Sequence, residues 1–201
     1  MRICDHEQGS KEWLEARLGC PSASNFGKLI TPTGKPSAQA KQYICELISQ
    51  GFMMKIPESF TNEWMERGTL NEPKARQLYE IAKGLDVQEI GFCKHEVLEC
   101  GASPDGLVGS DGGLEIKCPA PARHVEYLYN NEVPVKYLPQ IQGCMWITGR
   151  QWWDFVSYHE TMPALIVRVE RDDLYISSLE EEVTKACEEI QAGIARIRSI
   201  K

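Results

Sequence analysis

An aspartate, a hairpin signal and a Glu-x-Lys pair stand close together in the middle of the chain. Asp105 follows a proline, and ten residues later Glu115 and Lys117 are separated by one apolar residue. Side chains alternate between the two faces of a β-strand, so Glu115 and Lys117 project on one face while their apolar neighbours pack on the other. The glycine-rich segment 109–113 has the composition of a hairpin loop. The spacing therefore predicts that Asp105 and Glu115 converge, with Lys117 beside them.

These groups are suited to holding a small, hard dication such as Mg²⁺. Such an ion binds one or two carboxylates, a carbonyl and several waters, so the expected ligands are Asp105, Glu115 and the main-chain carbonyl of Ile116. The cation lowers the pKa of bound water, and neighbouring positive charge lowers that of Lys117, which would then position or deprotonate the attacking water. The alternative is structural, because Glu-x-Lys is often a solvated pair and Pro-Asp-Gly an ordinary turn. Their joint occurrence favours a metal-dependent nuclease.

A second group of candidate residues lies near the N-terminus. Residues 10–19 predict a short helix with Ser10 as its N-cap and Gly19 at its end. Trp13 and Arg17 are four residues apart and so share a face of this helix. Residues 22–24 would open a second helix, whose free N–H groups favour an anion. The segment predicts a phosphate pocket around Arg17; the alternative is an ion pair of Arg17 with a nearby glutamate.

The remaining pattern alternates between helices and strands. Helical spacing is found in 37–51, 61–84 (with a bend or restart at Pro73), 121–130, 134–148 and a terminal helix with an apolar stripe from Leu179 to Ile197. Short apolar runs predict strands at 87–92, 97–100, 107–108, 114–118, 151–158 and 165–169. The aromatic residues of 151–158 are assigned to the core rather than to a base-stacking platform. The expected fold is α/β, with a central mixed sheet flanked by helices.

Composition predicts a soluble intracellular enzyme. The chain has 201 residues, of which 42% are hydrophobic, and this matches one domain over 1–201. No run approaches the ~20 apolar residues that span a bilayer, and no apolar signal segment opens the chain, so the expected location is the cytoplasm, with no membrane contact. The net charge of −7 argues against nonspecific coating of DNA. It leaves room for a basic lining confined to a channel.

Five motifs in order resemble the phage-type alkaline exonucleases of the lambda exonuclease and YqaJ-like viral recombinase family, within the PD-(D/E)xK nuclease superfamily. The motifs are Trp13–Gly19 with Ser22–Ser24, Arg67–Glu72, Ser103–Gly106, Leu114–Pro119 and Tyr137–Trp146. The resemblance implies a restriction-endonuclease-like core in which the catalytic residues are Asp105, Glu115 and Lys117, with Glu72 and Gln142 helping to shape the centre. It also implies that a terminal 5′-phosphate is held by Arg17, Ser24 and Ser103.

The resemblance further implies an activity. The enzyme would be a Mg²⁺-dependent exodeoxyribonuclease that digests one strand of linear double-stranded DNA from a 5′-phosphorylated end, 5′ to 3′, and leaves a 3′ single strand for phage-type recombination. Two Mg²⁺ ions, with Mn²⁺ as a substitute, would be bridged by Asp105: one activates water and the other stabilises the departing 3′-oxygen, while Lys117 assists the nucleophile. The family also implies a ring-shaped homotrimer and a phage single-strand annealing protein as partner.

The cysteines indicate no further cofactor. Eight are scattered without a Cys-x-x-Cys pair, which favours buried free thiols. Some members of the superfamily bind an iron–sulfur cluster through closely spaced C-terminal cysteines, but here only Cys187 follows Cys144. We expect no iron–sulfur cluster.

Two alternatives stay open at this point. One is a structure-specific or restriction-type endonuclease of the same superfamily. The other is a noncatalytic DNA-binding or assembly protein that retains the fold, against which the intact Asp105, Glu115 and Lys117 argue.

Overall fold

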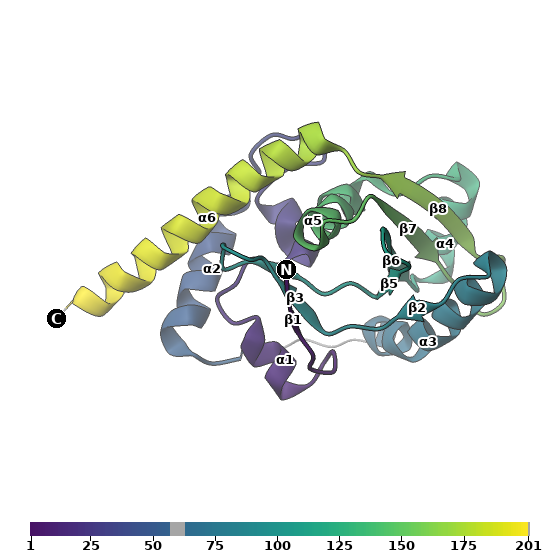
Figure 1. The fold of residues 1–201 in the computed structure, drawn as a ribbon, viewed down its shortest axis with the longest axis horizontal. Coiled ribbons are helices and arrows are strands. Elements are labelled where there is room, and N and C mark those ends of the chain that lie inside the picture. Colours follow the sequence, from purple (N-terminus) through teal and green to yellow (C-terminus); the bar gives the residue numbers. More distant parts are fainter. Residues whose placement is uncertain (57–62, 201) are drawn as a thin grey trace.

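The computed structural model of the chain describes residues 1–56 and 63–200. Its helices (Figure 1) are α1 (Lys11–Ala16), η1 (Ala23–Lys28), α2 (Ala40–Met53), α3 (Glu63–Lys83), α4 (Pro121–Asn130), η2 (Val135–Tyr137), α5 (Leu138–Thr148) and α6 (Asp173–Ser199). Its strands are β1 (Arg2–Cys4), β2 (Val87–Gln88), β3 (Phe92–Lys94), β4 (Gly101–Ala102), β5 (Gly106–Val108), β6 (Gly112–Lys117), β7 (Trp152–Ser157) and β8 (Leu165–Glu170).

The strands form two sheets. The larger has the order β2-β5-β6-β7-β8 and the smaller the order β1-β3-β4. In the larger sheet β6 and β7 are parallel, whereas the other neighbours are antiparallel. The connection from β6 to β7 contains α4, η2 and α5, which is the helical crossover that parallel strands need. The predicted α/β fold with a central mixed sheet is confirmed, and the separate small sheet was not foreseen.

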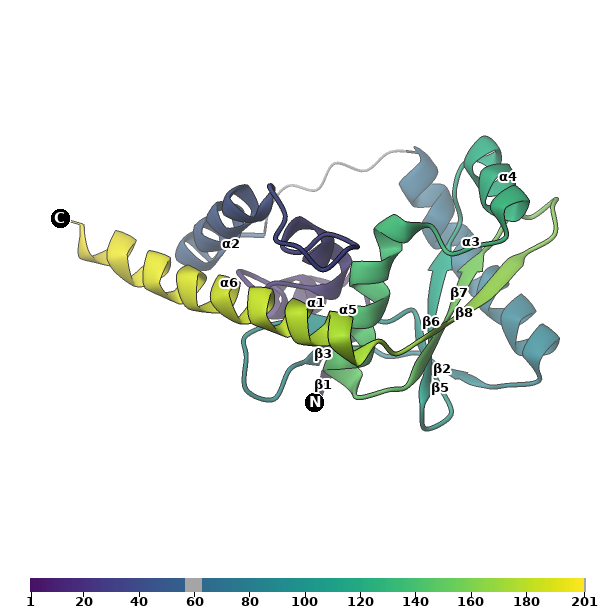
Figure 2. The same cartoon turned by 90° about the horizontal axis from the view of Figure 1, so that it is seen from above.

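Helices cover both faces of the larger sheet. On one face Tyr79 of α3 packs in a cluster with Leu114 and Ile116 of β6. On the other face the buried residues of α5 pack against Trp153 and Phe155 of β7. Figure 2 shows α3 and α5 on opposite sides of these strands. Because side chains alternate along β6, the glutamate between its two apolar residues faces α5.

The β5–β6 hairpin has the predicted arrangement. Gly106 pairs with Leu114, and the turn occupies residues 109–111. Gly109 has a φ of +54°, in the left-handed region that glycine adopts without strain. Gly113 was expected in the loop but lies in β6, where a Cβ would come within 2.2 Å of the Trp153 ring on β7. Glycine here allows the indole to lie directly against the strand that carries Glu115.

Two predicted strands were wrong in detail. The run 87–92 is divided, because β2 joins the larger sheet and β3 the smaller. Residues 97–100 form a bend and not a strand. The imidazole Nδ1 of His95 accepts hydrogen bonds from the N–H groups two and three residues further on, and the N–H of His95 donates to the carbonyl of Cys100 at 2.9 Å. These local bonds close a turn that apolar composition alone did not reveal.

The N-terminal helices are shorter than predicted. Ser10 is the N-cap of α1, and its Oγ accepts from the N–H of Trp13 at 3.2 Å, as expected. The helix ends at Ala16, where tighter turns take over before Gly19, whose φ is +65°. The second helix, η1, is of the 3-10 type.

A bend or a restart was predicted at Pro73. The long middle helix α3 continues through this proline, so it does not restart there. Residues 61 and 62, with which the predicted helix begins, lie outside the described residues.

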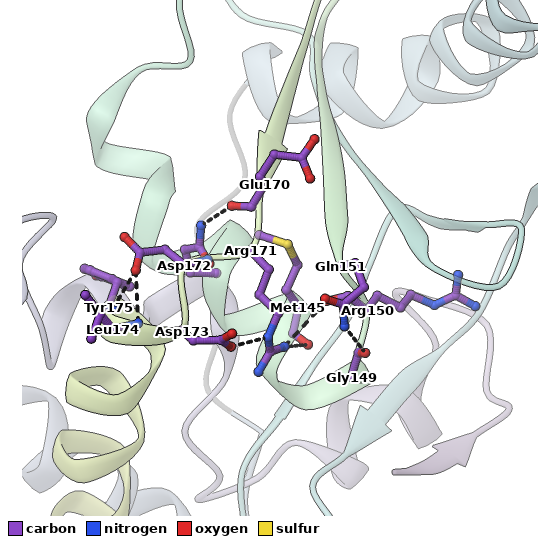
Figure 3. Close-up of polar contacts among 11 residues, drawn as sticks. Met145, Gly149, Arg150, Gln151, Glu170, Arg171, Asp172, Asp173, Leu174 and Tyr175 are labelled. Carbon is purple, nitrogen blue, oxygen red and sulfur yellow. Dashed lines mark hydrogen bonds and ion pairs between the residues drawn. The ribbon is translucent and has the colours of Figure 1, made fainter.

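The terminal helix α6 is fixed at its start by capping bonds (Figure 3). The carboxylate of Asp172 accepts from the second and third N–H groups of α6, and Arg171 donates to Asp173 at 2.6 Å and to the carbonyl of Met145 in α5 at 2.8 Å. The predicted apolar stripe is buried from Leu179 as far as Ile190. These contacts tie α6 to the helix that faces Glu115.

Burial agrees with the sequence-based assignments of aromatic and sulfur-containing residues. Trp153 and Phe155 are fully buried, and Trp152 and Tyr158 are half-buried. Five of the eight cysteines are buried as free thiols: Cys20, Cys93, Cys100, Cys144 and Cys187. Within the described ranges no helix combines the length and apolar composition needed to cross a membrane.

The close approach of β6 and β7 gives a stability prediction. We expect Gly113→Ala to lower the free energy of unfolding by about 1–3 kcal/mol, because a Cβ would overlap the buried Trp153 ring. Gly68→Ala in α3 is the control, since a Cβ there meets nothing within 4 Å. It should leave stability unchanged or raise it by up to about 1 kcal/mol through helix propensity. Urea denaturation measures both, and equal effects would contradict this account of the packing.

Candidate nuclease site

Asp105, Glu115 and Lys117 meet at the open end of the β5–β6 hairpin. Asp105 comes immediately before β5, and its Oδ2 accepts from the N–H of Ile116 at 2.6 Å. Glu115 is fully buried, and its Oε1 forms an ion pair with the Nζ of Lys117. The Lys117 side chain is 28% exposed. The predicted convergence of two carboxylates and one amine is therefore present.

Glu115 carries an unsatisfied oxygen. Its Oε1 accepts from Gln140 Nε2 at 2.6 Å in addition to the lysine, but its buried Oε2 has no hydrogen-bond partner. Leaving a buried carboxylate oxygen unpaired is costly, so native structures usually reserve such an atom for a ligand. The unpaired Oε2 fits a bound cation.

The main chain of Ile116 can supply a third oxygen. In a β-strand the N–H and C=O of one residue point to the same edge. The N–H of Ile116 points to Asp105, while the carbonyl of the next residue, Lys117, accepts from Tyr158 on the opposite side at 2.8 Å. The Ile116 carbonyl thus faces Asp105. In the described residues no three His, Cys, Asp or Glu side chains form a closed metal site. Two carboxylates and a carbonyl are the sparse oxygen set that suits Mg²⁺.

Burial shifts the pKa values of the carboxylates upward. Burial, opposed by Lys117 and reinforced by Asp105, raises the pKa of Glu115 to about 7. Burial likewise raises the pKa of Asp105, against the lowering effect of Lys117 and of the Ile116 hydrogen bond. Removing a carboxylate from water disfavours its charged form, which a dication would restore.

For Lys117, the nearby charges shift the pKa by more than burial does. Burial lowers its pKa, but the carboxylates of Glu115 and Asp105 raise it by more. The lowering predicted from the sequence would come from a bound cation, whereas the protein's own carboxylates raise the pKa of Lys117. The Nζ of Lys117 pairs with Glu115, and an ammonium group held in this way is suited to positioning a water or phosphate.

Glu72 also reaches the site, from α3. Burial and the charge of Asp105 raise its pKa to about 7. Its Oε1 pairs with Arg76 at 2.9 Å. Arg76 also donates to the carbonyl of Asp105 at 3.3 Å and pairs with Glu89 at 3.0 Å, and its side chain is 10% exposed. Arg76 was not among the residues predicted from the sequence, although its position four residues after Glu72 was a detectable signal.

A cavity of about 510 Å³ opens beside these groups. Its lining includes Asp105, Glu72 and Arg76 as well as Trp13. Asp105 and Glu72 are thus reachable from outside, whereas Glu115 is fully buried and does not line this cavity. This is the concave, titratable arrangement expected of an active site.

The three residues predicted to bind a 5′-phosphate also come together. The guanidinium of Arg17 donates to Ser103 Oγ at 2.9 Å and lies 3.4 Å from Ser24 Oγ. It packs over the Trp13 ring at 4.0 Å, and the indole N–H donates to the same Ser103 oxygen at 3.1 Å. Ser22 adds a third hydroxyl at 3.2 Å. Only Pro104 separates Ser103 from Asp105, so this pocket adjoins the carboxylates.

Gln142 is not brought to the site, and that assignment was wrong. Its Nε2 donates to the carbonyl of Glu170 at 2.9 Å, and its Oε1 accepts from the N–H of Asp172 at 3.0 Å. The side chain therefore joins α5 to the start of α6. Gln140, two residues earlier in α5, is the glutamine that contacts Glu115. Residues two positions apart on a helix do not share a face, so only one of these two glutamines can contact Glu115.

Comparison with known proteins places the chain in a family. It matches the YqaJ-like viral recombinase domain over residues 12–151. The chain belongs to this family. The alkaline exonuclease LHK-Exo from Laribacter hongkongensis is 39% identical, with a TM-score of 0.86 over 94% of this chain and 96% of that chain. A structure of LHK-Exo in complex with dAMP gives the same values. Comparison with curated proteins gives no match.

A more distant structure shares the fold. A phage related exonuclease from Haemophilus somnus 129PT is 18% identical, with a TM-score of 0.71 over 89% of this chain and 96% of that chain. The predicted PD-(D/E)xK fold is confirmed by these neighbours. Family, fold and site together identify the chain as a nuclease that acts on DNA and uses a divalent metal ion.

The two glutamines of α5 give a paired prediction. We expect Gln140→Ala to reduce nuclease turnover with little change in melting temperature, because it is half-exposed and orients Glu115. Gln142→Ala should do the reverse, lowering the free energy of unfolding by about 1–2 kcal/mol because it removes the two part-buried hydrogen bonds to the carbonyl of Glu170 and the N–H of Asp172. Turnover and thermal unfolding, measured on both variants, decide which of the two glutamines acts at the site. Loss of turnover in Gln142→Ala without loss of stability would restore the sequence-based assignment.

The raised carboxylate pKa values predict how a metal stabilises the protein. In the folded state the pKa of Glu115 is above its ordinary value. The free energy of unfolding of the metal-free protein therefore falls as pH rises from about 4.5 to about 7, and above pH 7 it stays at this lower value. Mg²⁺ binds the ionised carboxylates, so its stabilising effect should be larger at pH 8 than at pH 6.

Melting temperature with and without Mg²⁺ at the two pH values measures this effect. Glu115→Gln, which cannot ionise, should lose most of the Mg²⁺-dependent increment. An increment in the parent chain that is the same at both pH values would argue against these carboxylates as ligands.

Proposed function

We propose that the chain is a Mg²⁺-dependent exodeoxyribonuclease that digests one strand of linear duplex DNA from a 5′-phosphorylated end. It would work 5′ to 3′ and leave a 3′ single strand for recombination. The observation that carries this proposal is the buried, unpaired Oε2 of Glu115, whose carboxyl group is within electrostatic range of Asp105. Only Pro104 separates Asp105 from Ser103, which binds Arg17. The alkaline exonuclease at 39% identity supports it, and the dAMP in that relative's complex is the kind of product that removal of single nucleotides yields.

The pocket around Arg17 suits a terminal phosphate. A guanidinium presents a planar fork of donors that matches phosphate oxygens, and hydroxyls can donate alongside it. Burial lowers the pKa of Arg17, but an arginine stays charged at neutral pH. Stacking on Trp13 and the bond to Ser103 fix the fork in place. We assign Arg17, Ser24 and Ser103 to the 5′-phosphate.

The catalytic roles follow from the hydrogen bonds. Asp105, Glu115 and the Ile116 carbonyl would hold Mg²⁺, and the family resemblance implies two such ions per site. When bound, Mg²⁺ supplies positive charge that lowers the pKa of water and offsets charge on the phosphate. Gln140 and Lys117 both engage Oε1 of Glu115 and so leave Oε2 free.

Lys117 and Glu72 have different roles. Lys117 orients the attacking water as a hydrogen-bond donor. Glu72, whose pKa is raised to about 7, is suited to exchange a proton near neutral pH.

The family resemblance also supports assembly as a ring-shaped homotrimer around DNA and a phage single-strand annealing protein as partner. We propose both for this chain, together with a single nuclease domain over residues 1–201. A ring would keep the enzyme on its substrate between successive cleavages.

Linear duplexes labelled at either end test polarity, end recognition and metal dependence together. With Mg²⁺, label at a 5′-phosphorylated end should be released first, as mononucleotide, and the complementary strand should persist. A 5′-hydroxyl end should be cut more slowly in the parent chain, and Arg17→Met should remove this difference because it deletes the phosphate-binding fork. Asp105→Ala should abolish release while thermal unfolding shows that the variant is folded.

Covalently closed circular DNA separates the exonuclease from the alternative endonuclease. Circles should persist under conditions that degrade linear duplex. Nicking or linearisation would favour the structure-specific or restriction-type endonuclease. Undiminished release by a folded Asp105→Ala chain would overturn the assignment of the site.

A further inference from the structure

A second hollow reaches the site from the side of α5 and η1. It is a groove of about 310 Å³, distinct from the 510 Å³ cavity that contains Asp105. We refer to it as the lysine groove. Its lining includes Ser24, Asn25, Lys28, Gln39, Lys136 and Gln140. Because η1, the start of α2 and the η2–α5 segment all contribute, the tertiary structure creates it.

The two hollows carry opposite charge. The larger cavity is lined by five carboxylates, those of Asp5, Glu7, Glu72, Glu89 and Asp105, against one arginine and one histidine. The described residues that line the lysine groove include two lysines and no Asp or Glu. In a chain of net charge −7, this local excess of positive charge suits a polyanion.

Aromatic rings hold both lysines. Lys28 Nζ lies 4.9 Å from the centre of the Tyr43 ring and 3.7 Å from Glu46, whose side chain is 44% exposed. Lys136 Nζ lies 4.7 Å from the centre of the Tyr137 ring. A ring face attracts an ammonium group without neutralising it, and an exposed ion pair such as Lys28–Glu46 is weak. Both lysines therefore keep charge available to a ligand.

The groove joins the two parts of the site. Gln140, in its wall, donates to Glu115. Ser24, also in its wall, contacts Arg17 in the phosphate pocket. Tyr137, a further wall residue, lies under Lys117, with its ring centre 5.3 Å from Nζ. A strand whose 5′ end is bound by Arg17 and whose scissile bond is at Glu115 would pass along this wall.

We propose that the lysine groove binds a backbone phosphate of the DNA strand being cut, with Lys28 and Lys136 supplying the charge. The side-chain amides of Asn25 and Gln39 add neutral donors. The site contacts phosphate and not base edges, so it contributes affinity without sequence preference. This assignment rests on the proposed exonuclease activity and adds a subsite to it.

Salt dependence of DNA binding tests the groove. The probe is a 5′-phosphorylated duplex, bound by the full chain carrying Asp105→Asn so that it is not digested. Lys28→Gln and Lys136→Gln should each reduce the slope of log affinity against log salt by about 1, and the double variant by about 2. Lys185→Gln is the matched control, because it removes the same charge from α6, where Lys185 pairs with Glu181 and Glu182. Its slope should equal that of the parent.

The contact is located with a series of duplexes, each of which carries one neutral methylphosphonate linkage at a different position near the 5′ end. At one position the neutral linkage should weaken binding by the chain with both lysines, and it should have no further effect on binding by the double variant. Two results would refute the proposed phosphate contact in the lysine groove. One is a salt slope of the double variant equal to that of the control, and the other is an equal weakening of the two chains by the neutral linkage at every position.

Digestion by the chain with Asp105 intact separates the two proposals. If that chain degrades linear duplex while the groove variants bind normally, only the groove is refuted. If the chain with Asp105 intact releases no nucleotide with Mg²⁺, the proposed function is refuted, and the proposed role of the lysine groove is refuted with it.

Discussion

The site depends on keeping the charge of Glu115 buried. A carboxylate with no exposure is unfavourable unless it is paired, and here Lys117 and Gln140 pair only one of its oxygens. The raised pKa of Glu115 reflects this incomplete compensation. A dication at Oε2 would complete it, so the same interaction that makes the metal-free site costly gives it affinity for metal. Protein stability and metal binding are linked through this one side chain.

Arg76 organises the acidic side of the site. It contacts Glu72, the carbonyl of Asp105 and Glu89, and so connects α3 to the start of β5. Several carboxylates lie close together there, and mutual repulsion would separate them without a central cation. A guanidinium with five donors can bridge three acceptors at once, which a lysine could not do with the same geometry.

The backbone around the site is held by dense packing on the α5 face of the larger sheet. The Trp153 ring lies against Gly113, and the Phe26 ring of η1 lies against Gly143 of α5, where a Cβ would be 2.4 Å away. The second contact brings η1, with its Ser24, close to the helix that carries Gln140. The Arg17 cluster, the carboxylates of Asp105 and Glu115 and the lysine groove thus share one packed support, which is what the proposed placement of a reacting phosphate requires.

The sequence by itself determined the features that depend on local geometry. Alternation along a strand and a short glycine turn are enough to bring Asp105, Glu115 and Lys117 together, and helical spacing places Arg17 beside Trp13. The family motifs extended this to Ser24 and Ser103, which the structure also brings to Arg17.

Only the tertiary structure decided how separate elements face one another. The rotation of α5 about its axis determines that Gln140 and not Gln142 meets Glu115, and the course of α3 brings Arg76 to Asp105. Likewise, Lys28 and Lys136 are far apart in the chain and share a groove only because η1 packs on α5. Local spacing fixes a side chain's face relative to its own element, whereas long-range packing fixes where that face points.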